Sequence, residues 1–124
     1  MILLILYSET NNMNKILSEN EIKQFRKEGA VFLKNKFDIT WINKLRTGIK
    51  RDIKNPSPRF KSHTIQKDVP AYLEDYWTWH LVPEFKEFVY NSPYARIASE
   101  LMSAKKINLV MDNWFLREAG SKSS

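Results

Sequence analysis

The sequence predicts an α+β fold, in which three or four helices pack against a small number of strands. Two observations indicate this class: apolar residues recur at helical spacing behind helix-start signals, and short apolar runs of strand length lie between those segments. The composition is globular, with 43% hydrophobic and 13% aromatic residues, and 124 residues without an internal repeat suit one domain.

The first helix is expected behind Ser18, because Ser18 and Glu21 form the Ser-x-x-Glu pattern of a capping box. It should end near residue 28, since Gly29 suits the left-handed position that follows many helices. The apolar run 30–33 then predicts a short buried strand.

A second helix is expected behind Asp38 or Thr40, either of which can cap it. Gly48 lies inside this helix and should cost about 1 kcal/mol relative to alanine. Two prolines end it, and residues 55–70 predict a long surface loop. The apolar residues of the helix share one face because their spacings are three, four and four: Ile42, Leu45, Ile49 and Ile53.

The second half of the chain predicts two strands and two helices. The strands are the aromatic segment 72–79 and the apolar run 107–116, which ends before Gly120. Pro83 opens one helix, whose inward residues are Phe85, Phe88 and Val89. Ser92-Pro93 begins the other helix, and one face of it carries Tyr94, Ile97, Ala98, Leu101 and Met102.

The N-terminal run 1–7 predicts a first strand or an appended segment rather than a targeting signal. Its seven residues are too few to cross a bilayer, which takes about 20, and it lacks a basic segment and a small-residue cleavage site. Residues 1–16 are therefore assigned to an N-terminal extension or first strand, and residues 17–124 to the domain. Because the chain also has no cysteine, we expect a soluble cytoplasmic protein with no membrane partner.

Positive charge is concentrated between residues 44 and 67, which hold eight Lys or Arg and one acid, while the rest of the 124-residue chain is nearly neutral. Such a segment can attract an anionic partner, and the alternative is an ordinary solvated helix face and loop. We do not expect nucleic acid as a partner, since no base-reading basic helix or RNA-binding aromatic signature accompanies the charge.

Several catalytic classes lack the residues they need. A non-haem iron site takes two histidines and a carboxylate, but neither His63 nor His80 is followed two residues later by Asp or Glu. No Gly-x-Ser-x-Gly elbow is present, and three scattered glycines form no phosphate-binding loop. Asp112 interrupts an apolar run, so it either finds hydrogen-bond partners or faces a cavity, or else it points outward from a half-solvated sheet.

Four blocks of the sequence form a familiar pattern. The first block, residues 17–33, is a helix that begins with Leu-Ser, contains Phe25, ends at Gly29 and is followed by an apolar run. The second block is Trp77-Thr78-Trp79 and the third is the segment 83–93. The fourth is the segment 107–121, which ends in Arg-Glu-Ala-Gly-Ser. Their order and spacing resemble the N-terminal portion of the phytanoyl-CoA dioxygenase family, and the likeness covers residue 17 to the C-terminus.

Members of that family are Fe(II)- and 2-oxoglutarate-dependent dioxygenases built on a double-stranded β-helix. The resemblance therefore implies N-terminal helices plus the first strands of an incomplete double-stranded β-helix, or jelly roll, which needs about eight strands in full. In the family a His-x-Asp pair follows the Glu-x-Gly-Ser/Thr loop, here 118–121, and the remaining ligands lie further on. The 124 residues contain none of them. Fe(II) and 2-oxoglutarate are thus expected in the complete enzyme and not on this chain alone.

The resemblance also places three residues at the reaction site. Trp114 and Trp77 fall where relatives contact 2-oxoglutarate, and Asp112 falls where it can face a substrate. Inward side chains of the last strand should share one parity, namely Asp112, Trp114 and Leu116. Ordinary core packing is the alternative for both tryptophans.

These observations predict an enzyme fragment that is inactive alone because its metal ligands are absent. A basic module that binds an anionic partner is the first alternative, and a split enzyme completed by a second polypeptide is the other. The substrate of the complete enzyme would be a small molecule. Unpaired edges of the incomplete sheet should favour self-association.

Overall fold

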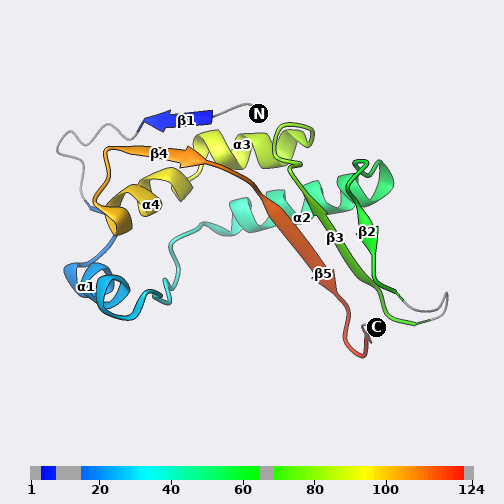
Figure 1. The fold of residues 1–124 in the computed structure, drawn as a ribbon, viewed down its shortest axis with the longest axis horizontal. Coiled ribbons are helices and arrows are strands. Elements are labelled where there is room, and N and C mark those ends of the chain that lie inside the picture. Colours follow the sequence, from blue (N-terminus) through cyan, green and yellow to red (C-terminus); the bar gives the residue numbers. More distant parts are fainter. Residues whose placement is uncertain (1–3, 8–14, 65–68, 122–124) are drawn as a thin grey trace.

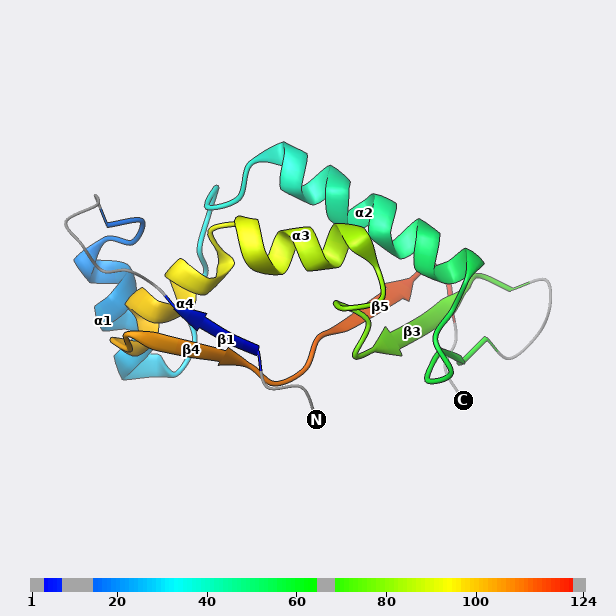
Figure 2. The ribbon, with the colours of Figure 1, turned by 90° about the horizontal axis from the view of Figure 1, so that it is seen from above.

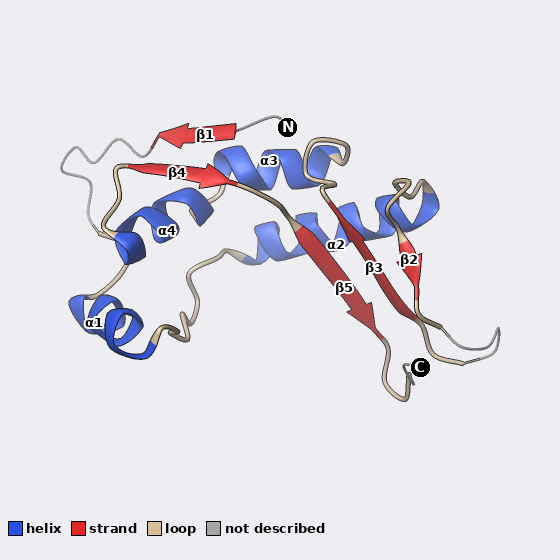
Figure 3. Cartoon of the chain, viewed as in Figure 1, coloured by secondary structure: helices blue, strands red, loops and turns tan. Residues whose placement is uncertain are grey.

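A computed structural model of the chain describes residues 4–7, 15–64 and 69–121. Along the chain, helices and strands alternate irregularly (Figures 1 and 3). The elements are β1 (Leu4–Tyr7), α1 (Glu19–Glu28), α2 (Ile39–Lys54), β2 (Lys61–Ser62), β3 (Tyr72–Tyr76), α3 (Pro83–Asn91), α4 (Tyr94–Met102), β4 (Lys106–Leu109) and β5 (Asn113–Arg117).

The strands form two small antiparallel sheets, one with the order β1-β4 and the other with the order β2-β3-β5. Helices α2 and α3 run side by side across one side of the larger sheet (Figure 2). The fold class is therefore α+β, as predicted. The N-terminal run contains a strand, β1, which agrees with the first of the two predictions for this run, a first strand or an appended segment. Residues 1–3 and 8–14 lie outside the described residues.

Alternation along β3 and β5 gives the larger sheet two unlike faces. Leu73 pairs with Leu116, and Asp75 pairs with Trp114, on the side that packs against the helices. We call these four residues the covered face. The other side, which we call the open face, carries Tyr72, Glu74, Tyr76, Asn113, Phe115 and Arg117.

The core lies between the covered face and helices α2 and α3. Its buried residues come from α3, the turn before it and the last two strands, and α2 adds the apolar stripe predicted from its spacing. Gly48 allows the two helices to approach, because a Cβ at this position would lie 2.7 Å from Cδ1 of Phe85. The buried members of the core are Trp79, Val82, Phe85, Val89, Leu109 and Trp114.

The predicted helix ends are confirmed where local chemistry determines them. Ser18 and Glu21 form both bonds of the capping box, and Gly29 ends α1 with a φ of 76°. Of the two proposed caps for α2, the carboxylate of Asp38 accepts the bond, from the backbone N–H of Thr40. The start of α4 is one residue later than predicted, because Pro93 and not Ser92 is the N-cap; the Ser92 hydroxyl oxygen accepts from the backbone N–H of Tyr94 at 3.2 Å.

Two strand predictions are wrong. Residues 30–33 form no strand, because the described strands pair with one another and none of them pairs with this run. Phe32, in the middle of the run, is 84% exposed. The run 107–116 is two strands, not one: β4 pairs with β1, whereas β5 pairs with β3. The chain changes partner at residues 110–112, and the bond from the backbone N–H of Trp77 to the carbonyl oxygen of Asp112 is in register with the β3–β5 pairs that follow.

Three smaller expectations also change. The strand predicted over 72–79 ends at Tyr76, since Trp77 has a φ of 56° and starts a turn. The loop 55–70 contains the two-residue strand β2, and its residues 65–68 lie outside the described part of the chain. Met102, predicted on the inward face of α4, is exposed.

Candidate functional site

The turn that follows β3 is held against the linker between β4 and β5, where Asp112 lies. The backbone N–H of Trp77 donates to the carbonyl oxygen of Asp112 at 3.0 Å. Thr78 binds the Asp112 carboxylate twice, since its backbone N–H and its hydroxyl donate to Oδ2 at 3.3 and 2.9 Å. Asp112 is therefore fixed by a turn that is 34 residues away in the sequence.

The second carboxylate oxygen of Asp112 is in a different state. Oδ1 is buried and has no hydrogen-bond donor among the described residues. Asp112 also lines a cavity of about 390 Å³ between the helices and β5. Of the two orientations that the sequence left open, the cavity-facing one with hydrogen-bond partners is the one observed, although Asp112 lies in a linker and not within a strand.

The cavity, which we call the helix-side cavity, is almost entirely apolar. It is lined by Leu45 and Ile49 of α2, by three residues of α3, and by side chains that flank the β4–β5 linker. Among its lining residues only Asp112 carries a charge. The aromatic members of the lining are Trp79, Phe85, Phe88, Tyr94 and Trp114.

Trp114 lies on the covered face, where it is buried in the core. Its indole N–H donates to Oδ2 of Asp52 on α2 at 2.8 Å. Asp52 is only 2% exposed, and burial raises the pKa of its carboxyl. The bond from Trp114 opposes that rise in pKa, while the carboxylates of Asp75 and Asp112 add to it. Trp114 thus has both a packing role and a hydrogen-bonding role.

Asp75, opposite Trp114 in the sheet, is fully buried. Its carboxylate accepts from the hydroxyl of Ser57 at 2.7 Å, from the backbone N–H of Ser57 at 3.0 Å and from the backbone N–H of Tyr76 at 2.8 Å. The bonds tie the loop after α2 to β3. A buried carboxylate needs hydrogen-bond donors, and here those from Ser57 come from an element that is distant in the sequence.

Sequence reasoning missed both Asp52 and Asp75. A signal for each was present, because Asp52 follows Ile49 by three residues on the apolar face of α2. Asp75 likewise alternates with Leu73 on the face of β3 that proved to be covered. A carboxylate at an apolar position in either periodicity indicates a buried polar group with dedicated partners.

Trp77 lies close to Asp112 in the backbone but does not line the helix-side cavity. Its side chain is 43% exposed. The guanidinium carbon of Arg59 lies 5.9 Å from the ring centres of both Trp77 and Tyr76, and Arg59 donates to the carbonyl oxygens of the same two residues at 3.1 and 3.0 Å. The structure therefore brings Asp112 and Trp114 to one cavity and places the Trp77 side chain elsewhere.

The open face carries aromatic and basic groups that touch one another. His63 packs on Tyr72 with ring centres 4.9 Å apart, and its Nε2 lies 3.1 Å from Oε1 of Glu74. The guanidinium carbon of Arg117 lies 5.5 Å from the centre of the Tyr72 ring. Phe115 is 57% exposed in the middle of β5. The sequence alone does not indicate a site at these residues, because their shared face depends on how β3 and β5 pair.

The basic segment is partly neutralised by α3. Arg51 binds the carboxylate of Glu84 through two nitrogens, at 3.0 and 2.7 Å, and this pairing lowers the pKa of Glu84. Lys44 forms an ion pair with Glu87. Lys67 lies outside the described residues. The exposed basic side chains of the segment that form no ion pair within the described residues are Arg46, Lys50, Lys54 and Lys61.

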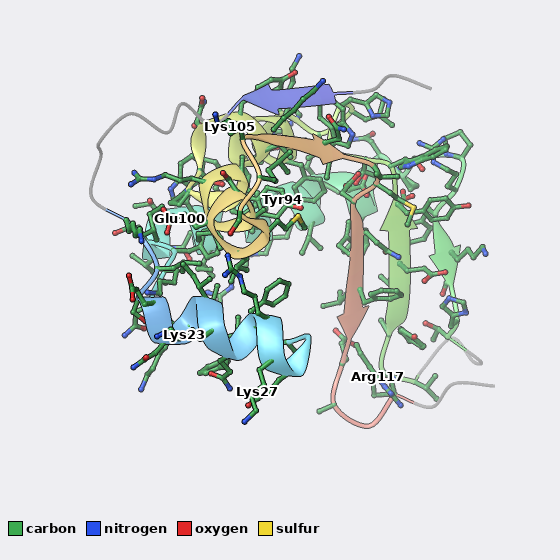
Figure 4. All side chains as sticks on the ribbon, turned by 60° about the vertical axis from the view of Figure 1, so that its left-hand side comes forward. Lys23, Lys27, Tyr94, Glu100, Lys105 and Arg117 are labelled. Carbon is green, nitrogen blue, oxygen red and sulfur yellow. The ribbon has the colours of Figure 1, made fainter. Side chains whose placement is uncertain are left out.

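A second cavity of about 470 Å³ lies between α1 and α4. Its lining includes Lys23 of α1 and Lys105 after α4, and Figure 4 shows these helices side by side. The carboxylate of Glu100 also lines it but is occupied, because it accepts from the backbone N–H groups of Ile16 and Leu17 at 3.0 and 2.8 Å. Arg117 lies toward the far end of β5, away from this groove (Figure 4).

The described residues hold no cluster of three or more His, Cys, Asp or Glu suited to a metal ion. His63 contacts Glu74, and His80 is exposed in the turn beside Trp79, with ring centres 5.5 Å apart. In the same part of the chain, no helix combines the length and the apolar character needed to span a bilayer.

Comparison of the chain with protein-family models, with curated proteins and with solved structures gave no match in any of the three. The resemblance to the phytanoyl-CoA dioxygenase family therefore depends on the four sequence blocks alone.

Proposed function

We propose that this chain is the N-terminal portion of an Fe(II)- and 2-oxoglutarate-dependent dioxygenase resembling the phytanoyl-CoA dioxygenase family. The observation that supports it best is the two-faced sheet. Helices cover one face of β2-β3-β5, while the other presents Phe115 and Tyr76 without a second layer among the described elements. In a β-sandwich the second sheet packs on such a face.

The proposal changes which residues are expected to line the reaction site. In a sandwich completed over the open face, the interior of the barrel would be lined by Asn113, Phe115 and Arg117. Trp114 would then lie between the sheet and the helices and would support the site from outside. The geometry thus favours the opposite parity on β5 from the one that the resemblance suggested for Trp114 and Leu116.

The iron itself would be held by residues outside those described. His63 contacts Tyr72 and Glu74, whereas His80 packs beside Trp79, and the two histidines share no carboxylate in the described structure. When bound in a complete enzyme, Fe(II) with 2-oxoglutarate supplies the oxidising power for hydroxylation. The role proposed for this chain is to position one sheet and its supporting helices.

The test is succinate release from 2-oxoglutarate with ferrous ion present. We expect none from the 124-residue chain, and turnover from a longer polypeptide, or from a co-expressed second chain, that adds both the His-x-Asp pair and the second histidine after residue 124. Turnover by the 124 residues alone would refute their inactivity. Absence of both iron binding and turnover in the completed protein would refute the assignment to dioxygenases.

One observation favours a second candidate, a basic module for an anionic partner. Arg46, Lys50 and Lys54 recur every four residues on α2, so these exposed side chains form a stripe along one side of the helix. Binding to a polyanion such as heparin should then weaken steeply with added salt. Replacing the three residues by glutamine should abolish the salt-dependent binding, whereas an unchanged salt slope would exclude this stripe.

A further inference from the structure

The cavity of about 470 Å³ between α1 and α4, which we call the α1–α4 groove, receives basic side chains from two segments of the chain. Lys23 and Arg26 come from α1, where a spacing of three residues places them on one face of the helix. Lys105 comes from the segment between α4 and β4. Figure 4 shows α1 beside α4, with Lys23 on the first helix and Lys105 after the second. Two separate segments therefore bring positive charge to one groove.

The acidic side chains that line the α1–α4 groove already have partners. The carboxylate of Glu19 lies 3.8 Å from the ammonium of Lys15, which is the remaining basic group of the lining. The carboxylate of Glu100 accepts two backbone N–H groups of the segment before α1, at 3.0 and 2.8 Å. Nε of Arg96 lies 3.4 Å from the same carboxylate. The two acidic groups are thus not available to neutralise the other cations of the groove.

The three other cations have no carboxylate partner. Within the residues that the structure describes, Lys23, Arg26 and Lys105 form no ion pair. Arg26 donates from Nη2 to the hydroxyl oxygen of Ser103, which is a neutral acceptor and leaves the positive charge uncompensated. Because the Ser103 hydroxyl accepts this bond through its oxygen, its hydrogen can be donated to a ligand. The groove therefore combines three uncompensated cations with a neutral donor.

The C-terminal end of α4 borders the α1–α4 groove, and unpaired carbonyl oxygens at a helix C-terminus repel anions. Here the chain itself occupies them. The carbonyl oxygen of Ser99 accepts from the backbone N–H of Ala104 at 3.1 Å, and that of Glu100 accepts from the backbone N–H of Ser103 at 3.4 Å. The Ser99 hydroxyl donates to the carbonyl oxygen of Ala104 at 2.6 Å. With these acceptors used, the charged groups that the groove offers to a ligand are donors.

The number of uncompensated cations indicates the class of ligand. A phosphate monoester carries about 1.5 to 2 negative charges near neutral pH, so two phosphate groups match the three cations better than one phosphate or one carboxylate does. Arginine can bind phosphate oxygens through two N–H groups at once, and lysine acts as a point charge. The volume of the groove lies within the range of small-molecule sites, roughly 300–1,000 Å³. Its lining holds no aromatic ring on which a base could stack.

We propose that the α1–α4 groove binds a compact small molecule that carries two phosphate groups, held by Lys23, Arg26 and Lys105, with the Ser103 hydroxyl donating to one phosphate oxygen. This inference is independent of the proposed function, because the groove lies between α1 and α4 and the proposed reaction site lies on the open face of the β2-β3-β5 sheet. The site is also distinct from the basic stripe of α2, none of whose residues lines the groove.

The test compares pyrophosphate, inorganic phosphate and succinate on the full 124-residue chain by isothermal titration calorimetry at low salt. Succinate has a length similar to that of pyrophosphate but less negative charge. Pyrophosphate should bind about threefold to tenfold more tightly than either of the others, because it alone carries enough charge for all three cations. Added salt should weaken it, since these side chains are exposed. No binding of pyrophosphate, or an equal affinity for phosphate or succinate, would overturn the proposal.

Two double variants locate the site. Lys23→Gln combined with Lys105→Gln removes one cation from each of the two segments and should weaken pyrophosphate binding about fivefold to twentyfold. Lys50→Gln combined with Lys54→Gln makes the same change in net charge on α2 and should weaken it less than about twofold. Equal weakening by the two double variants would mean that net charge alone attracts the anion, and the proposal would be refuted.

A measurement on the unmodified chain keeps the test decisive if a double variant does not fold by circular dichroism. Pyrophosphate should shift the backbone amide NMR signals of Lys23, Arg26 and residues 103–105 more than the signals of α2. Shifts confined to α2, or spread evenly over the exposed basic residues of the chain, would place the anion elsewhere and contradict the proposal.

Discussion

The covered face and the open face of the β2-β3-β5 sheet come from the same strands, yet they differ in how their polar groups are treated. On the covered face, Asp75 is fully buried and each polar group has a partner in Ser57, Tyr76 or a helix. On the open face, Glu74 and Arg117 meet aromatic rings or His63 at partly exposed positions. The covered face therefore holds the buried contacts of this sheet, while Phe115 and Arg117 of the open face are exposed.

The largest expected effect tests this division on adjacent residues of β5. Trp114→Ala should lower the free energy of unfolding by about 3–5 kcal/mol, because it leaves a cavity and removes the bond to buried Asp52. Phe115→Ala, one residue later on the exposed side, should change it by only about 0.5 kcal/mol. Urea unfolding of both variants provides the measurement. Equal losses would show that the open face is packed in solution.

The contact between α2 and α3 behind the covered face gives the next effect. Gly48→Ala should improve helix propensity by about 1 kcal/mol, but the new Cβ meets the buried ring of Phe85. We expect overpacking to dominate and to cost about 1–3 kcal/mol. In thermal unfolding, Gly48→Ala combined with Phe85→Leu should be less destabilised than the sum of the single variants. Simple additivity would contradict a contact between these two positions.

A smaller effect is expected from Asp52 and depends on pH. Because burial raises the pKa of Asp52 above its usual 3.8, the folded state keeps a proton that the unfolded chain has lost. Stability from this group therefore falls as the pH rises from 3.8 to the folded-state pKa, and the loss is complete above it. Asp52→Asn keeps an acceptor for Trp114 and should remove this loss.

The measurement is the difference in unfolding free energy between Asp52→Asn and the unmodified chain across the acidic range. It should be smallest below pH 3.8 and grow as the pH rises. Asp38 behaves oppositely, since the bond from the backbone of Thr40 lowers its pKa and its stabilisation is lost as the pH falls. Asp38→Asn is thus the control, and the same pH trend in both variants would exclude the burial of Asp52 as the cause.

The sequence correctly predicted those features of the fold that depend on residues close together in the chain. The capping box of Ser18, the end of α1 at Gly29 and the apolar stripe of α2 each depend on a few residues in one turn of helix. The change of partner at Asp112 could not be predicted in this way, because it depends on Trp77 and Thr78 in another turn. Whether residues 110–112 continue a strand is decided by those distant bonds.

The candidate site shows the same limit. The family resemblance pointed to Asp112 and Trp114 as site residues, and the structure places both in the lining of one cavity. The sequence could not tell which parity of β5 faces the helices, since either face of an alternating strand can be buried until its partners are known. The exposed positions of Phe115 and Arg117 became visible only with the pairing of β3 and β5.

The smallest effect on stability concerns the open face itself. In the described structure, β5 has β3 on one side and is the last strand of its sheet, so its edge and Phe115 should promote self-association. Phe115→Lys should change the unfolding free energy by only about 0.5 kcal/mol. It should also shift the chain from associated species to monomer in sedimentation velocity. Phe32→Lys, a change at a still more exposed phenylalanine between α1 and α2, makes the same change in charge away from the sheet. If both variants dissociate the chain to the same extent, net charge and not the open face controls its association; if Phe115→Lys alone does so, the open face is the surface on which the chain takes up another layer.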